Sequence, residues 1–266
     1  MPTEIFLNIE EDILSILQGK PLKVVKALFA DAEIAVLQDY SNIVSVSRLL
    51  YNDHGAYHMR RALKNAIIIA NLLHKRGVQL NVEKEKSGDF NDGLIALSVA
   101  AFIHDIGMSI AREDHEKHSV TLGYPIIERI LNTCYCDDLR KKVAVRSLIL
   151  ESILGHMRTL KISSVEAGII LVADGCDCEK GRARIPYNRE SVGKNGDIHM
   201  YSSQAIESIE ITGGKELPIK IDVVMSASVG FFQVEEVLMP KINSSTIKDF
   251  IELYAGQTGK TPKKYL

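Results

Sequence analysis

The chain has 266 residues, of which 46% are hydrophobic and 25% charged, so it can bury a sizeable core. Its net charge of −2 gives no electrostatic reason to expect a nucleic-acid or membrane partner. The longest apolar run, the ten residues Leu94–Ile103, is too short to span a bilayer, and the acidic N-terminal stretch lacks the layout of a secretion signal. These features predict a cytoplasmic protein.

From about residue 9 to residue 180, apolar side chains mostly recur at three- and four-residue spacing, which predicts a helical domain. A short amphipathic helix is expected over 9–17. Longer helices are predicted over 22–50, 58–75, 92–108, 115–132, 137–158 and 164–178. The polar stretch 81–93 reads as an exposed loop between two of them.

After Gly181 the pattern changes to many turn residues with little periodicity, followed by β-branched, alternating segments. Strands are predicted over 208–214, 217–227 and 230–242, and a final helix from Ser244 to Ala255. We therefore expect a mainly α protein. Residues 1–182 would form a helical domain, and 183–266 a long crossing loop with a small α+β extension.

The four cysteines form two C-x-C pairs, Cys134 with Cys136 and Cys176 with Cys178. Residues two apart point away from each other on a helix and to opposite faces of a strand. A four-thiolate zinc site would usually show C-x2-C spacing. We expect ordinary reduced cysteines, as is usual in the cytoplasm.

Histidine and aspartate recur at the ends of the predicted apolar helices. His104 and Asp105 directly follow the most apolar segment, where each would carry a desolvation cost of about 1–3 kcal/mol if left unpaired. Other such residues at predicted helix ends are His58, His115, His118, His156 and Asp174. Ligands from several facing helices are what a metal site in a bundle requires. Imidazole and carboxylate together suit Mn, Fe, Co, Ni or Zn.

The pattern resembles the HD phosphohydrolase superfamily over roughly residues 45–180. "HMRRA" looks like the first box of that family, "AAFIHDIG" like the second and "IILVADGCD" like the last. The resemblance implies an HD-type helical bundle with metal ligands His58, His104, Asp105 and Asp174. The tail from "GRARIPY" onward is similar to that of uncharacterised, largely archaeal-type HD proteins.

Members of that family carry one or two divalent metals, and both forms stay open for this chain. The two-metal form adds two histidines and uses the Asp of the pair as a bridge, which implies that Asp105 bridges. His156 fits one added position. His115 fits the other because small Ser119 follows four residues later, although His118 stays an alternative.

The subfamily that hydrolyses cyclic di-GMP has a Lys after "HDIG" and a paired "HH" followed by "GYP". Here Met108 follows the box, Gly155 precedes His156, and "GYP" lies earlier, at 123–125. A cyclic dinucleotide substrate is therefore not expected.

The resemblance implies a phosphohydrolase that cleaves a phosphate ester or nucleotide through metal-bound hydroxide. Residues expected to carry catalysis are Asp105, His115, Arg61, Arg158 and Arg182, the arginines because each lies near a predicted ligand and can bond phosphate bidentately. His54 is a further candidate, as a proton donor or a lid contact; otherwise it is a loop histidine.

The alternative function is a non-catalytic, metal-containing module for ligand binding or signalling. The expected partner is a small phosphorylated substrate, with nucleotides among the candidates. No membrane or nucleic-acid partner is expected, because the Lys-rich end "GKTPKKYL" reads as a solvated terminus. Whether the chain forms a homo-oligomer stays open.

Overall fold

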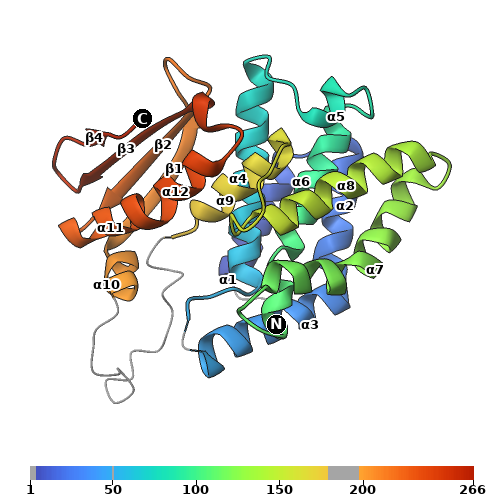
Figure 1. Cartoon of the computed structure of the whole chain (residues 1–266), viewed down its shortest axis with the longest axis horizontal. Coiled ribbons are helices and arrows are strands. Elements are labelled where there is room, and N and C mark those ends of the chain that lie inside the picture. Colours follow the sequence, from blue (N-terminus) through green and yellow to red (C-terminus); the bar gives the residue numbers. More distant parts are fainter. Residues whose placement is uncertain (1–3, 50, 179–197) are drawn as a thin grey trace.

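The computed structural model describes residues 4–49, 51–178 and 198–266. Figure 1 shows a bundle of helices beside a small sheet that carries helices of its own. The predicted fold class is confirmed at this level: the protein is mainly helical and ends in a small mixed α and β part.

The bundle is built from helices of the first 175 residues. In chain order these are α1 (Glu4–Ser15), α2 (Gly19–Ala30), α3 (Ala32–Asn42), the π-helical segment η1 (Ile43–Arg48), α4 (Ala56–Lys75), α5 (Asn81–Lys84), α6 (Phe90–Ile103), the 3-10 segment η2 (Ile106–Ser109), α7 (His115–Tyr135), α8 (Leu139–Gly155) and α9 (Val165–Gly175).

Two sequence predictions in this part need correction. The helix expected over 22–50 is broken at Asp31, whose carboxylate accepts a hydrogen bond from the Ile34 N–H at 3.1 Å and so caps the start of α3. The loop expected over 81–93 contains the short helix α5, because the buried Glu166 carboxylate accepts the N–H groups of Asn81 and Val82 at its start. That carboxylate comes from α9, so only the tertiary structure provides it.

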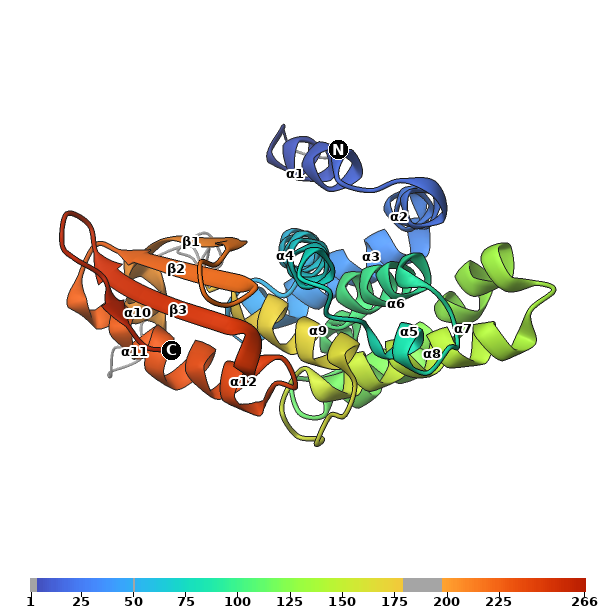
Figure 2. The same ribbon diagram turned by 90° about the horizontal axis from the view of Figure 1, so that it is seen from above.

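Helix α6 is the centre of the bundle and packs against α2, α4, α8 and α9 (Figure 2). Asp89 caps its start by accepting the Asp92 N–H at 3.1 Å. The segment Phe90–Ser109 is long and apolar enough to cross a membrane by composition, but 94% of its apolar window is buried inside the protein. It is therefore placed as a core helix.

The C-terminal part holds a four-stranded sheet in the order β1-β2-β3-β4. Its strands are β1 (Ile206–Gly213), β2 (Ile219–Met225), β3 (Ile251–Gln257) and β4 (Lys263–Lys264). Strands β2 and β3 pair in parallel, and the other two pairs are antiparallel. The sheet is accompanied by α10 (Ile198–Ala205), the 3-10 segment η3 (Ser228–Gly230), α11 (Phe231–Gln233), the π-helical segment η4 (Val234–Leu238), α12 (Met239–Ser244) and the 3-10 segment η5 (Lys248–Phe250).

The predictions for 230–242 and 244–255 are wrong. Residues 230–242 are helical rather than a strand, and the predicted final helix contains most of β3 instead. Parallel strands need a crossover between them, and the helical segments after β2 supply it. Strand β3 is almost continuously buried, and such apolar runs do not distinguish strand from helix by periodicity.

One apolar core runs through both parts. The same cluster of buried side chains includes Ile67 of α4, Ile95 of α6, Ile221 of β2 and Leu253 of β3. Helix α4 packs against β1 and β2, and α12 packs against α9. Residues 183–197 of the predicted crossing loop lie outside the described residues. The α+β extension therefore shares its core with the bundle.

Candidate metal centre

Six imidazole and carboxylate side chains converge from the ends of the bundle helices. His58 lies in the first turn of α4, His104 caps the end of α6, Asp105 directly precedes η2, His115 begins α7, His156 caps the end of α8, and Asp174 lies in the last turn of α9. All six are buried, with exposed fractions of 0–3%. The helix ends therefore meet at one buried point.

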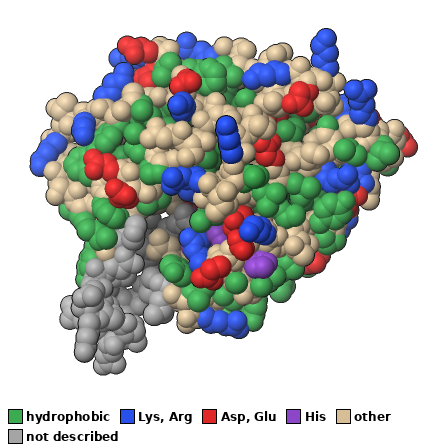
Figure 3. All heavy atoms as spheres, viewed as in Figure 1, with side chains coloured by type: hydrophobic (Ala, Val, Ile, Leu, Met, Phe, Trp, Pro, Cys, Tyr) green, Lys and Arg blue, Asp and Glu red, His purple; other side chains and the backbone are tan. Residues whose placement is uncertain are grey.

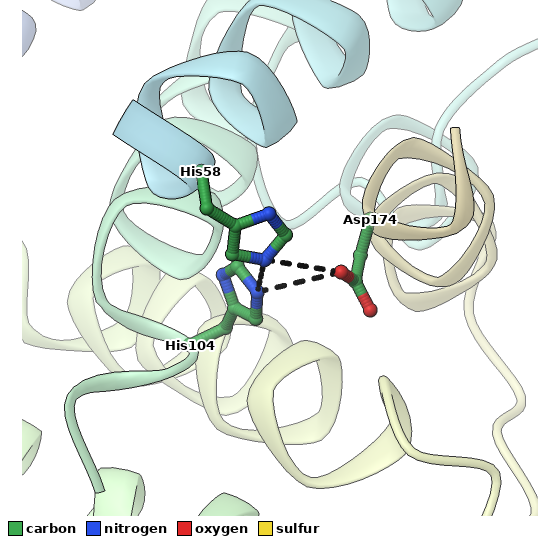
Figure 4. Close-up of side chains that lie close together, drawn as sticks. All are labelled: His58, His104 and Asp174. Atoms are coloured by element: carbon green, nitrogen blue, oxygen red, sulfur yellow. Dashed lines mark hydrogen bonds and ion pairs between the residues drawn. The ribbon is translucent and has the colours of Figure 1, made fainter. Parts of the chain in front are cut away.

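One half of this cluster consists of His58, His104 and Asp174, drawn in Figure 4. The Nε2 atoms of His58 and His104 lie 3.1 Å apart, and they are 3.2 Å and 3.8 Å from Asp174 Oδ1. Asp105 Oδ2 faces the same pair, 3.2 Å from His58 Nε2 and 3.5 Å from His104 Nε2. Two imidazole nitrogens and two carboxylate oxygens thus surround one position.

The other half uses the second oxygen of Asp105. Its Oδ1 lies 3.2 Å from the Nε2 atoms of both His115 and His156, and these two nitrogens are 3.1 Å apart. His104, Asp105 and His156 also offer ligand atoms within 4.8 Å of one another. The two oxygens of Asp105 therefore face the two halves of the cluster.

The backbone fixes the tautomers of three of the histidines. The Nδ1 atoms of His104, His115 and His156 lie 2.9, 2.8 and 2.6 Å from the carbonyl oxygen three residues earlier in the chain. A carbonyl oxygen only accepts, so each Nδ1 must carry the hydrogen, and a neutral ring then has a lone pair at Nε2. Two such lone pairs 3.1 Å apart repel each other unless a proton or a metal ion lies between them.

The Asp177 carboxylate accepts the hydrogen of His58 Nδ1, as backbone carbonyl oxygens do for the other three rings. Its Oδ2 lies 2.7 Å from His58 Nδ1, and its Oδ1 accepts from Arg61 Nε at 3.4 Å. Sequence reasoning missed Asp177, although it lies three residues after Asp174, a spacing that places both carboxylates on one side of a helix end. A second carboxylate behind a histidine is a common support for a metal ligand.

Charge within the cluster is set by its carboxylates. Burial alone would raise the pKa of Asp105, but its interactions with the four surrounding imidazoles, His104, His115, His156 and His58, hold it well below its usual value. Burial opposes a charge on His115, yet its hydrogen bond and charge interaction with Asp105 raise the pKa of that imidazole. Burial lowers the pKa of His156 to about 4, with the hydrogen bond to Asp105 opposing it and the neighbouring His104 and His115 adding to it. At neutral pH His156 is therefore neutral and offers its lone pair.

These donors fit a divalent transition metal. The Nε2 atoms of four histidines and the oxygens of two aspartates form a nitrogen and oxygen set of the kind that Mn, Fe, Co, Ni or Zn accepts when the imidazoles are neutral. A metal ion would also remove the repulsion between the facing lone pairs. The histidine and aspartate groups could therefore hold a metal, and the donor set does not distinguish among these ions.

The arginines predicted to carry catalysis differ in their contacts with the cluster. Arg61 contacts Asp177 behind His58, and its side chain is 19% exposed. Arg158 is exposed, and among the described residues its contact is with Ser244 of α12, at 3.3 Å, rather than with a carboxylate of the cluster. Arg182 lies outside the described residues. Among the described residues, Arg61 therefore contacts the aspartate that supports His58, whereas Arg158 does not.

The two remaining histidine candidates lie apart from the facing nitrogens. His118 is half-buried one turn after His115, which is the residue that faces Asp105. The ring centroid of His54 is 5.9 Å from that of His58, and its Nδ1 lies 2.6 Å from the Asn52 carbonyl oxygen. Neither side chain completes the ring of ligand atoms described above.

A cation that the sequence did not reveal comes from the extension. Lys241 of α12 donates a hydrogen bond to Asp174 Oδ2, the oxygen that faces away from His58 and His104. Burial would raise the pKa of Asp174, but the charge of Lys241 and the hydrogen bonds of the two histidines lower it well below its usual value. The lysine and the aspartate are 67 residues apart, so no local spacing could have paired them.

Fold and cluster together define a mainly helical protein with a buried histidine–aspartate group that could hold a metal ion. The uncharacterized protein MJ1020 of Methanocaldococcus jannaschii is 38% identical to this chain over 242 residues, which are 91% of each protein. The chain therefore belongs to the same family as that archaeal protein. No family model and no solved structure matches the chain. Its chemistry is accordingly argued from the site itself.

Proposed function

We propose that this protein is an HD-type, metal-dependent phosphohydrolase that cleaves a phosphate ester or a nucleotide. The observation that carries the proposal is that the Nε2 atoms of four histidines converge on the oxygens of Asp105 and Asp174, while three of these rings contact a backbone carbonyl through Nδ1. The order and spacing of these residues, which resemble the HD pattern, support it further.

The histidines and aspartates of the cluster would form two metal-binding positions. His58, His104 and Asp174 would hold one ion, His115 and His156 the other, and Asp105 would contribute one oxygen to each. A divalent metal would supply Lewis-acid polarisation of a phosphoryl oxygen and activation of water at neutral pH. The protein contributes fixed ligands in a buried site, so that little reorganisation is needed during phosphoryl transfer. The chain's own contribution is therefore positioning.

Cationic side chains near the site support a phosphorylated substrate. Arg61 lies within 3.4 Å of Asp177 and Lys241 contacts Asp174, so cationic side chains border the cluster where an anionic ester would need them. The expected substrate is a small phosphorylated molecule. None of the four cysteines forms a disulfide, which supports the reduced, cytoplasmic setting that we propose for the protein.

The test combines metal content and turnover. The protein, stripped with a chelator and reloaded with Mn²⁺, Fe²⁺, Co²⁺, Ni²⁺ or Zn²⁺, is assayed by elemental analysis and on aryl phosphates, phosphodiesters and a nucleotide panel. We expect stoichiometric metal and turnover that Asp105→Ala abolishes, because this carboxylate faces both halves of the cluster. The matched control is Asp222→Ala, which removes an aspartate paired with Lys220 on β2.

Tightly bound metal without turnover of any phosphate compound would replace this proposal with the non-catalytic module. Absence of metal binding would remove both. A change in Asp222→Ala as large as that in Asp105→Ala would show that the assay reports folding rather than the site.

A further inference from the structure

We propose that the C-terminal extension completes the active site, with Lys241 as the cation that binds the phosphoryl group of the substrate. The inference rests on the proposed function for its substrate class, and it assigns a role to the part of the chain that lies outside the HD-like motifs. Its starting observation is that an ammonium group from α12 reaches a carboxylate of the buried cluster.

The two oxygens of Asp174 are used differently. Oδ1 faces His58 and His104, whereas Oδ2 accepts the hydrogen bond from Lys241. A metal on the Oδ1 side would balance the charge of this carboxylate. The ammonium, held on the other oxygen, would then be available to an anion next to the metal position, as a compact point charge of the kind that binds phosphate.

Lys241 also lies between the cluster and solvent. Its side chain is 15% exposed, whereas those of His58 and His104 are fully buried. In the space-filling view basic, acidic and histidine side chains gather on the face shown (Figure 3). A substrate that approaches from solvent would therefore meet this lysine at the edge of the buried ligands.

Helix α12 is fixed to α9 by close packing rather than tethered loosely. In Figures 1 and 2 the two helices lie next to each other. A Cβ on Gly175 would lie 3.0 Å from Lys241 Cδ, so the lysine stem crosses α9 where the chain lacks a side chain. Two turns earlier, Ser245 Oγ donates to the Gly168 carbonyl at 2.9 Å, and a Cβ on Gly168 would clash with Thr246. These contacts give the ammonium a defined position.

The test measures anion binding separately from metal binding and from turnover. Calorimetry gives the Kd of Mn²⁺ for the metal-free protein and the Kd of inorganic phosphate for the Mn²⁺-loaded protein. Lys241→Met keeps the length of the stem but removes the charge, and Lys241→Arg keeps the charge. Lys264→Met is the matched control, because Lys264 forms an ion pair with Glu216 on the same extension.

We expect Lys241→Met to weaken phosphate binding about 10-fold or more, since it removes one charged hydrogen bond to the anion. Mn²⁺ should bind this variant at least as tightly as the wild type, because a neighbouring positive charge has gone. Lys241→Arg should retain most of the phosphate affinity, Gly175→Ala should lose part of it by displacing the stem, and Lys264→Met should match the wild type.

An unchanged phosphate Kd in Lys241→Met, or a wild type that binds no phosphate, would overturn the inference. So would a Mn²⁺ affinity that falls together with phosphate affinity, because Lys241 would then support the metal ligands only. Turnover with an unaltered KM in Lys241→Met would remove this role and leave the proposed hydrolase intact. Lys241-dependent phosphate binding without turnover would remove the hydrolase and retain the anion site.

Discussion

At the scale of single residues, the cluster depends on which nitrogen of each imidazole carries the hydrogen. For three rings the backbone carbonyl three residues earlier in the chain fixes this. The Nδ1 of His58, in the first turn of α4, faces the Asp177 carboxylate instead. Asp177 is therefore the residue whose removal should affect the metal without removing a ligand.

We predict that Asp177→Ala weakens metal binding about 10- to 100-fold, the usual range for loss of such a support. The His58 ring would lose the acceptor that holds its hydrogen on Nδ1, and Nε2 would then compete for that hydrogen. Titration calorimetry with Mn²⁺ or Zn²⁺ measures the effect, with Asp222→Ala as the control. Equal affinities of Asp177→Ala and the wild type would mean that His58 is oriented by its packing alone.

At the scale of elements, the site depends on how closely η2 and the start of α7 approach. The Gly107 N–H donates to Ser119 Oγ at 2.8 Å, and a Cβ on Gly107 would run into the His115 carbonyl oxygen and the Ser119 nitrogen. Both obstacles involve backbone atoms, which cannot turn aside as a flexible side chain would. The glycine after the His-Asp pair thus sets the position of His115.

Gly107→Ala should therefore destabilise the protein by about 1–3 kcal/mol, the usual cost of forcing extra volume into a packed interior. It should also weaken metal binding, because His115 must shift together with its backbone. Urea unfolding and calorimetry measure the two effects. Gly213→Ala is the matched control, since its Cβ would meet Leu72 at an ordinary 3.6 Å. A Gly107→Ala protein as stable as this control would refute the argument.

At the scale of the whole molecule, bundle and sheet share one apolar core and are also linked through Lys241 and Asp174. Extension and bundle should consequently unfold together, unlike two domains joined by a linker. The metal position lies in the bundle, so a bound ion would stabilise the extension as well. Adding metal therefore tests whether the bundle and the extension unfold cooperatively.

We predict one calorimetric unfolding transition that moves to higher temperature when metal is added. At a free metal concentration of 100 times Kd the gain in the free energy of unfolding is about 2.7 kcal/mol. Differential scanning calorimetry with and without chelator measures it, and Asp105→Ala should abolish the shift. Two transitions, of which the metal moves just one, would separate the extension from the bundle.

The sequence by itself determined the helical character of the first two thirds and the residues of the cluster. Histidines and aspartates at predicted helix ends are a local signal, and the resemblance to the HD pattern then implied the set His58, His104, Asp105, His115, His156 and Asp174, with His118 as the alternative to His115. The break at Asp31 was not predicted, although an aspartate that precedes a helical stretch is a common capping residue and was a local signal for it.

Only the tertiary structure decided the rest. The crossover after β2 and the buried strand β3 follow from parallel pairing between segments about 30 residues apart, which the apolar pattern of each segment does not encode. Asp177 behind His58 and Lys241 on Asp174 are likewise contacts between distant segments. The periodicity of a segment determines which of its faces is buried. Which polar atoms of distant segments contact that face is decided by tertiary packing alone.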